Sequence, residues 1–166
     1  MGRQEAIFLE SEGDAWHDRN RLKARPDEVL PLLHPHGITP SKIVEIGCGY
    51  GRRLHLISEA FPEALGYGID PSTDAISLAI KSYGGKRLTF LKSTAASVAI
   101  DECDLLIFGF CLYIMDREDL SNVIMMADSG LEDGGHLIIH DFDPEYPHKV
   151  PYHHVPGLFS YKMDYS

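Results

Sequence analysis

The residues best placed to bind a ligand are three glycines spaced two apart, Gly47, Gly49 and Gly51. They follow the apolar run Lys42–Ile46, which predicts a buried strand, and they precede Arg52–Phe61, which predicts an amphipathic helix. Glycines between a strand and a helix let a ligand approach the backbone, and the helix start offers free N–H groups. Asp70 ends the next predicted strand, where a carboxylate can accept hydrogen bonds from both hydroxyls of a ribose. Together these residues predict a nucleoside-binding site.

Residues around this loop discriminate among nucleotide ligands. A dinucleotide fingerprint places its third glycine at the sixth position, but the sixth residue counted from Gly47 is Arg52, and no Gly-Lys-Ser/Thr of a P-loop is present. Glu45, just before the loop, would repel a pyrophosphate and attract the ammonium group of a methionine moiety. Cys48 is expected to be a small residue that fits a tight turn. The sequence therefore favours S-adenosylmethionine over NAD as the cofactor.

Candidate catalytic residues follow the fifth predicted strand, Gly135–His140. His140 could act as a general base, because its unperturbed pKa lies near neutrality, or it could make a structural hydrogen bond at the strand end. Asp141 and Asp143 follow it directly. The histidines of the next loop are expected over the same strand ends, where they could bind substrate or a metal: His148, His153 and His154. Their spacing matches no strong metal motif, so we assign no metal ligands and take His140, Asp141 and His153 as the catalytic candidates.

Two aromatic residues follow the fourth predicted strand, Asp104–Phe110. Phe110 and Tyr113 could wall the sulfonium of the cofactor, and for Phe110 ordinary packing at the strand end is the alternative. Methyl transfer depends largely on positioning the acceptor atom in line with the methyl group. A base is needed only where that atom carries a proton, so the sequence need not show a fixed catalytic triad.

Composition limits the classes of partner. The chain has 166 residues, which suits one domain, and its formal net charge is −10, which disfavours nucleic acid and anionic membranes. The three cysteines form no Cys-x-x-Cys pair, which favours a reduced, cytoplasmic setting. The acidic N-terminus resembles no secretory signal, and no apolar run approaches the ~18 residues of a membrane span.

Alternating strand and helix patterns predict a doubly wound, mostly parallel α/β sheet. Further strands are expected at Leu65–Ile69 and Leu88–Leu91, and further helices at Pro26–Leu33, Asp74–Tyr83 and Asp116–Ser129. We expect residues 1–25 to form an irregular or partly helical arm and residues 26–166 to form the main domain. Gly157–Asp164 is expected to add one strand, so the sheet would lack its last strand or strands. Such an unpaired edge would favour a homodimer.

With these motifs, residues 38–143 resemble a class I S-adenosylmethionine-dependent methyltransferase. The glycine loop and its flanking strand are similar to the first motif of that family, and Tyr67–Ser72 is similar to the second. The resemblance implies a Rossmann-like fold, Asp70 as the ribose ligand, and Pro71 beside the adenine. The family often has an acidic residue after the third strand, near the adenine amino group, but here Ser93 and Thr94 stand in that stretch.

The segment Phe8–Asn20 resembles an arm that some small stand-alone methyltransferases fold over the cofactor. The resemblance implies that Trp16, Arg19 and Asn20 cover the cofactor, with a simple hydrophobic anchor as the alternative for Trp16. We therefore expect a methyltransferase that acts on a small molecule, with O-methylation of a sugar or sugar nucleotide as the first choice of reaction. The alternatives are a non-catalytic binding protein of the same fold and, third, a nicotinamide-dependent oxidoreductase.

Overall fold

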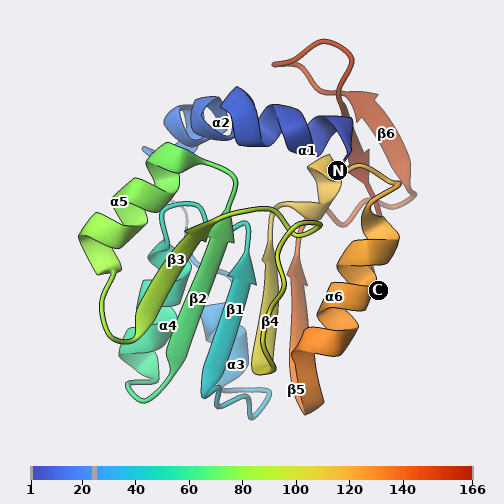
Figure 1. The fold of residues 1–166 in the computed structure, drawn as a ribbon. Helices are drawn as coiled ribbons and strands as arrows, with labels where there is room; N and C mark the ends of the chain where they lie inside the picture. The colour runs from blue at the N-terminus through green and yellow to red at the C-terminus, as the bar shows by residue number, and fades with distance from the viewer. Residues whose placement is uncertain (1, 24–25, 166) are drawn as a thin grey trace.

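The computed structural model describes residues 2–23 and 26–165. At its centre is a sheet of five parallel strands in the order β3-β2-β1-β4-β5 (Figure 1). The strands are β1 (Lys42–Ile46), β2 (Leu65–Asp70), β3 (Leu88–Lys92), β4 (Cys103–Gly109) and β5 (Leu131–His140). This sheet confirms the predicted Rossmann-like class. The strand order reverses beside β1, so the carboxyl end of β1 is the switch point at which such sheets bind ligands.

Helices pack on both faces of the sheet because the side chains of β1 alternate between two cores. Ile43 belongs to the core beneath α3 (Leu30–Leu33), α4 (Arg52–Ala60) and α5 (Thr73–Tyr83), where it lies with Leu54. Val44 and Ile46 belong to the opposite core, beneath α6 (Leu120–Gly130). Because β1 is covered on both faces, the loop that follows it is held rigidly in place.

The N-terminal arm is helical throughout most of its length. It consists of α1 (Arg3–Ile7), a π-helical turn η1 (Phe8–Glu12) and α2 (Gly13–Asn20). We call residues 3–20 the N-terminal helix. In Figure 1 it lies across the carboxyl ends of the strands, above the switch point. The expectation of an irregular or partly helical arm therefore understated its order, because a polar helix with a π-turn shows little regular periodicity.

Two predicted helices begin later than expected. α3 begins at Leu30 instead of Pro26, because the side chain of Asp27 accepts hydrogen bonds from the amides of Val29 and Leu30 and holds this segment in a turn before the helix. α6 begins at Leu120 instead of Asp116, because the Asp116 carboxylate instead accepts the amides of the first turn of α1. In both cases an acidic side chain near the predicted start holds the chain in another conformation.

The C-terminal residues form a separate two-stranded hairpin. β6 (His148–Pro151) pairs antiparallel with β7 (Phe159–Lys162), and we call residues 148–162 the C-terminal hairpin. The predicted strand at Gly157–Asp164 is therefore real, but it pairs with β6 and not with the main sheet. Within the described residues β5 remains an edge strand, and its Leu137 is 46% exposed.

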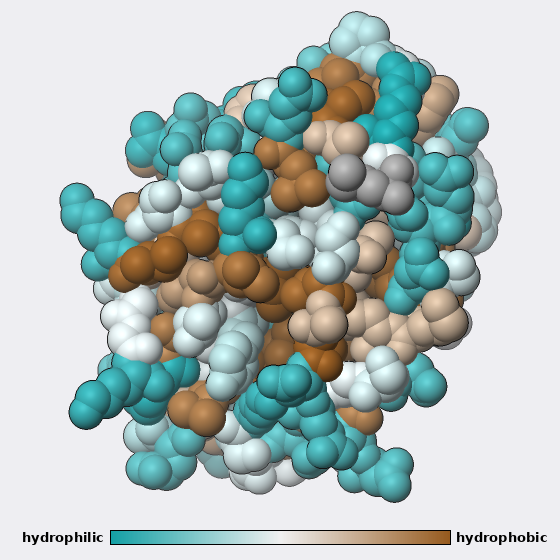
Figure 2. All heavy atoms as spheres, viewed as in Figure 1, coloured by the Kyte–Doolittle hydropathy of each residue, from teal (hydrophilic) through white to brown (hydrophobic). Residues whose placement is uncertain are grey.

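Hydrophobic residues also reach the surface. Figure 2 shows them across the middle of the face seen in Figure 1, with mostly hydrophilic residues below. The most exposed large apolar side chains of α6 are Ile124 and Met125. No helix within residues 2–23 and 26–165 has the length and apolar character needed to cross a bilayer.

Candidate functional site

The glycine loop after β1 has the left-handed backbone that its sequence predicts. Gly47, Gly49 and Gly51 have φ of +78°, +53° and +80°, values that other residues rarely adopt. The amides of Gly47 and Cys48 donate to the Ile69 carbonyl of β2 at 2.8 and 3.1 Å, which fixes the loop at the switch point. A Cβ on Gly47 would lie 2.6 Å from the Gly109 carbonyl oxygen, whereas one on Gly49 would meet nothing within 4 Å. The loop is therefore packed below and open above, where a ligand can approach.

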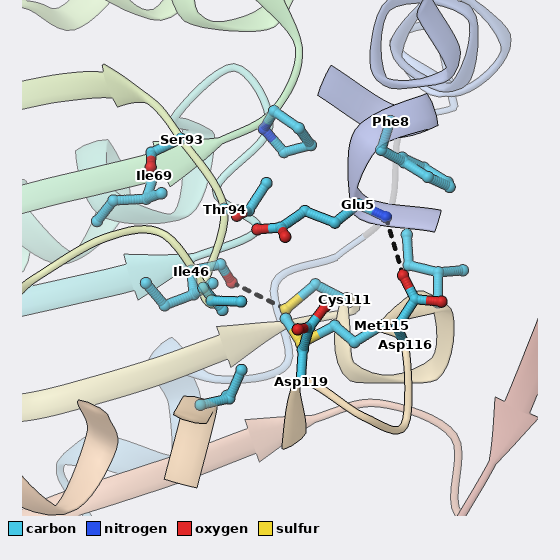
Figure 3. Close-up of a pocket in the computed structure, with 16 residues that line it drawn as sticks. Glu5, Phe8, Ile46, Ile69, Ser93, Thr94, Cys111, Met115, Asp116 and Asp119 are labelled. Atoms are coloured by element: carbon cyan, nitrogen blue, oxygen red, sulfur yellow. Dashed lines mark hydrogen bonds between the residues drawn. The ribbon is translucent and has the colours of Figure 1, made fainter. Parts of the chain in front are cut away.

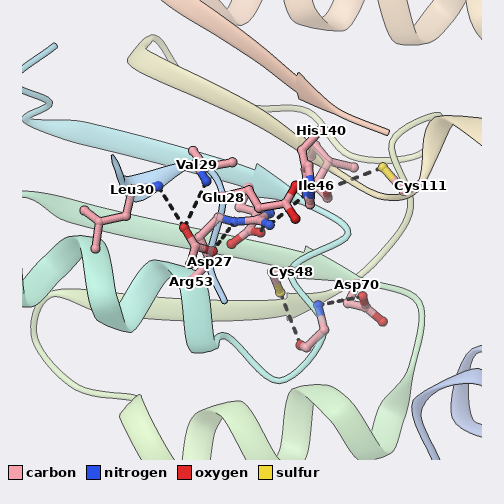
Figure 4. A network of polar contacts seen from close by, with 12 residues as sticks. Asp27, Glu28, Val29, Leu30, Ile46, Cys48, Arg53, Asp70, Cys111 and His140 are labelled. Atoms are coloured by element: carbon pink, nitrogen blue, oxygen red, sulfur yellow. Dashed lines mark hydrogen bonds and ion pairs between the residues drawn. The ribbon is translucent and has the colours of Figure 1, made fainter. Parts of the chain in front are cut away.

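Asp70 holds its carboxylate beside this opening. Its two oxygens accept the amides of Gly49 and Ser72, each at 2.9 Å, so its side chain ties the end of β2 to the glycine loop (Figure 4). Burial raises the pKa of Asp70 to about 6, although the two amide bonds oppose the rise. Each oxygen keeps a free lone pair. Asp70 therefore has acceptor sites left for the two hydroxyls of a ribose, and the ribose contact stays a prediction.

Glu45 lies on the opposite side of the loop, at the centre of a buried ionic network. Arg53 of α4 donates to Glu45 Oε1 and to Asp27 Oδ2, both at 2.8 Å (Figure 4). Burial raises the pKa of Glu45 to about 7, and the charge of Arg53 acts against that rise. Glu45 Oε2 is buried without a hydrogen-bond partner among the described residues. The predicted contact of Glu45 with an ammonium group stays a prediction, and Oε2 is the oxygen that would make it.

A pocket opens between the loops that follow β1, β2, β3 and β4, and the N-terminal helix closes it (Figure 3). Four of the predicted cofactor residues line it, namely Gly47, Pro71, Ser93 and Thr94. Cys111 also lines it, and its thiol donates to the Ile46 carbonyl at 3.4 Å. Sequence reasoning missed the lining residues of the N-terminal helix and of the segment before α6, because no local motif marks them: Glu5, Phe8, Met115, Asp116 and Asp119.

The N-terminal helix is bonded directly to the site. Asp14 Oδ1 accepts the Ser72 hydroxyl at 2.7 Å and the Asp74 amide at 3.0 Å, so α2 is fastened to the start of α5. Trp16 Nε1 donates to Tyr113 Oη at 3.2 Å. Asn20 donates to the Trp16 carbonyl at 2.8 Å and thus serves its own helix. Trp16 also packs against the apolar cluster of Phe8, Tyr152 and Leu158, in keeping with the anchor alternative. The cofactor contacts of Trp16 and Asn20 stay predictions.

The C-terminal hairpin holds this helix from the other side. Tyr152 Oη donates to Glu12 Oε1 at 2.7 Å, and Arg19 pairs with the same carboxylate. The Phe159 amide donates to Gln4 Oε1 at 2.6 Å. Both ends of the chain therefore combine into one cover over the strand ends.

Comparison with known proteins agrees with this geometry. Residues 15–163 match the family model described as a methyltransferase domain. The chain belongs to this methyltransferase domain family. Trans-aconitate 2-methyltransferase of Rhodopseudomonas palustris (strain BisB5) is 28% identical over 128 residues, which cover 75% of this chain and 49% of that protein. The chain thus spans about half the length of this relative.

Solved structures of methyltransferases share the fold. DhpI, in a complex described as DhpI-SAM-HEP, matches with a TM-score of 0.69 and 15% identity, covering 99% of this chain and 84% of that one. The O-methyltransferase of a trans-AT PKS multienzyme from Brevibacillus brevis, bound to S-adenosyl-L-homocysteine, matches with a TM-score of 0.67 and 16% identity. That match covers 96% of this chain and 55% of the other.

In this methyltransferase domain, both ring nitrogens of His140 already have partners. Arg53 Nη2 lies 2.9 Å from Nδ1, and Glu28 Oε2 lies 3.1 Å from Nε2 (Figure 4). Because arginine can only donate, Nδ1 must accept and the proton of a neutral ring is then on Nε2, facing Glu28. A base role for His140 stays a prediction, and it would require at least one of these partners to move.

Of the other two catalytic candidates, Asp141 follows His140 directly and His153 lies farther along the chain. Asp141 accepts the amides of Tyr113 and Phe142 at 3.2 and 2.8 Å, so it braces the segment after β4. Burial raises the pKa of Asp141, although these amide bonds oppose the rise. His153 is exposed in the turn of the C-terminal hairpin. No group of three or more metal-ligating side chains is assembled within the described part of the chain.

Phe110 is the strained residue of the site. Its φ of +55° is left-handed, which is costly for a residue with a bulky side chain. Its ring contacts Tyr113, His140 and Phe142, with centroids 5.1 to 5.7 Å apart. Phe142, which sequence reasoning did not select, completes this aromatic cluster where β4 and β5 end. The predicted role of Phe110 and Tyr113 beside the sulfonium stays a prediction.

Proposed function

We propose that this chain binds S-adenosylmethionine and transfers its methyl group to a small molecule. The observation that carries the proposal is the Asp70 carboxylate, held by two amides beside the open side of the glycine loop. The buried, unpartnered Glu45 Oε2 at the end of β1 also supports it, because that oxygen has no hydrogen-bond donor among the described residues. When bound, the cofactor supplies an electrophilic methyl group. Membership of the methyltransferase domain family favours this proposal over the nicotinamide alternative.

We assign two roles to the residues around the pocket: some would bind the cofactor and others would cover it. The glycine loop and Asp70 would hold the ribose and methionine parts, and Pro71, Ser93 and Thr94 would surround the base. We propose that residues 1–25 act as a lid, since the described part of this arm lies across the strand ends and is fastened to Ser72 and Tyr113. Such a lid would exclude water from the transfer.

We propose oxygen as the acceptor atom. Support comes from two relatives, one named for trans-aconitate, a carboxylic acid, and one named an O-methyltransferase. A carboxylate acceptor carries no proton at neutral pH, so it would need no base. That chemistry suits a site in which both nitrogens of His140 are occupied. A sugar acceptor has no such support and stays a prediction.

A His140→Gln substitution separates the two acceptor chemistries. If His140 is a base for a hydroxyl acceptor, we expect kcat to fall about 100-fold or more. If the acceptor is a carboxylate, kcat should change only a few-fold. Steady-state kinetics with the best acceptor would distinguish these results.

Calorimetry tests the cofactor and radiolabelled S-adenosylmethionine tests the transfer. We expect S-adenosylhomocysteine to bind and NAD not to bind, and we expect methyl transfer to at least one member of a panel of carboxylic acids, phenols and sugars. Binding of NAD alone would overturn the proposal. Binding of S-adenosylhomocysteine without any turnover across the panel would instead favour a non-catalytic protein of the same fold.

We also keep a homodimer as a proposal, because β5 is an edge strand with an exposed Leu137. Analytical ultracentrifugation of the chain and of a Leu137→Lys variant tests it. A monomer at all concentrations would contradict the proposal.

A further inference from the structure

Two buried polar atoms in the pocket have no hydrogen-bond partner. Within the described residues, Glu5 Oε2 and Thr94 Oγ1 are among six such side-chain atoms, and they are the two whose residues line this pocket. Glu5 is only 8% exposed. An unpartnered carboxylate oxygen in a buried site is costly. A pair of such atoms in one pocket therefore points to a ligand that supplies hydrogen bonds.

The position of the Glu5 carboxylate is fixed from both ends. Its backbone amide donates to Asp116 at 3.2 Å, and its Oε1 accepts the Ser97 hydroxyl at 3.0 Å. Figure 3 shows the side chain reaching from the N-terminal helix across the pocket toward Thr94. Burial raises the pKa of Glu5, while the Ser97 bond opposes the rise and the charges of Asp119 and Asp116 add to it. The second oxygen is thus held in the pocket.

Most of the other residues that line the pocket are apolar. They include Phe8, Ile46, Ile69, Ala95 and Val123. Ile69 and Pro71 flank Asp70 in the chain, so the pocket begins where the predicted ribose site ends. A nucleoside whose ribose is held by Asp70 can place its base between these walls. The polar edge of that base would then meet Glu5 and Thr94.

We propose that Glu5 recognises the adenine of the cofactor by accepting its exocyclic amino group, with Thr94 as a second partner on the base edge. The inference rests on the proposed use of S-adenosylmethionine. A carboxylate acceptor suits an amino group and opposes the carbonyl oxygen of a 6-oxo base. The stretch Lys92–Ala95 after β3 holds no acidic residue. The acid is supplied instead by the N-terminal helix, so recognition of the base requires that helix to be closed.

Calorimetric titration with S-adenosylhomocysteine and its 6-oxo analogue, S-inosylhomocysteine, tests the proposal on the full chain. For the unaltered protein we expect a preference for the amino base of about 10- to 100-fold, the value of one hydrogen bond to a charged group. In Glu5→Gln the amide can turn to donate to a 6-oxo group, so the preference should fall to about threefold or less. Glu10→Gln, at an exposed position on the same helix, is the matched control and should keep the full preference.

A second variant guards against a folding defect in the first. Ser97→Ala, at an exposed position, removes the hydroxyl that donates to Glu5 Oε1. It should lower the preference for the amino base over the 6-oxo base without changing the thermal melting point. An unchanged preference in both Glu5→Gln and Ser97→Ala, with S-adenosylhomocysteine still bound, would overturn the assignment of Glu5 and leave the proposed function intact. Failure of the unaltered chain to bind S-adenosylhomocysteine would instead overturn the proposed function and this inference with it.

Discussion

The two sides of the pocket are built in different ways. The side made by the glycine loop and Asp70 relies on backbone geometry and on hydrogen bonds between neighbouring parallel strands. The covering side, made by the N-terminal helix and the C-terminal hairpin, relies on side chains from opposite ends of the chain. Tyr152 bonds to Glu12 across 140 residues, and Phe159 bonds to Gln4 across 155. The first side is rigid by construction, whereas the second can separate when a few polar bonds break.

The largest expected effect comes from a substitution in the glycine loop, on the rigid side of the pocket. Gly47→Ala adds a Cβ 2.6 Å from the Gly109 carbonyl oxygen at a φ of +78°, so backbone strain and overlap combine. We expect the free energy of unfolding to fall by about 3 kcal/mol or more. Gly134→Ala is the matched control, since its φ is +83° but no atom lies within 4 Å, and it should cost about 1 kcal/mol. If urea unfolding shows equal losses in the free energy of unfolding for the two variants, backbone strain alone, without overlap at Gly109, explains the effect.

Asp70→Asn removes the carboxylate but keeps the side-chain volume. An amide has one acceptor atom, so it cannot hold both the Gly49 and Ser72 amides and still accept ribose hydroxyls. We expect the affinity for S-adenosylhomocysteine to fall about 100-fold in calorimetry. Asp74→Asn, an exposed neighbour at the start of α5, should bind as the unaltered chain does. If Asp70→Asn retains full affinity, the ribose assignment is wrong.

The pKa of Asp70 predicts how binding depends on pH. Because burial raises this pKa to about 6, Asp70 becomes protonated as the pH falls through that value and loses acceptor sites. Affinity for S-adenosylhomocysteine should rise as the pH rises through about 6 and should decline toward pH 5, by at most about tenfold per pH unit. The Asp70→Asn variant retains Glu45, whose pKa is about 7, so the difference between the two profiles isolates Asp70. Parallel profiles would contradict this.

The smallest effect concerns the covering side. Tyr152→Phe deletes the hydroxyl that bonds to Glu12, while Arg19 still pairs with that carboxylate. We expect a loss of about 1 kcal/mol in stability and a few-fold loss in cofactor affinity. Tyr146→Phe, at a position 67% exposed, is the control and should alter neither. A Tyr152→Phe loss as large as that of Gly47→Ala would mean that both sides are equally rigid.

The same division explains what the sequence could predict. β1, the glycine loop and Asp70 are contiguous or sit at strand ends, so hydrophobic runs and glycine spacing are enough to place them. The sequence predicts helix starts at Pro26 and Asp116. Both helices start later, and Asp27 and Asp116 instead bond to Arg53 and Gln4, which are distant in the chain. Glu5 carried no local signal at all. Pairing across more than a hundred residues depends on the folded topology and leaves no periodicity to detect.

The accessibility of Cys111 can report opening of the pocket. Its thiol lies in the pocket wall, and burial raises its pKa well above the usual range, so almost none of it is thiolate at neutral pH. A thiol-alkylating reagent can reach it only when the covering side lifts. The alkylation rate of Cys111 therefore reports how often the covering side opens. A bound cofactor that stabilises the closed state should slow this alkylation. Mass spectrometry over a labelling time course would thus measure how often the pocket opens.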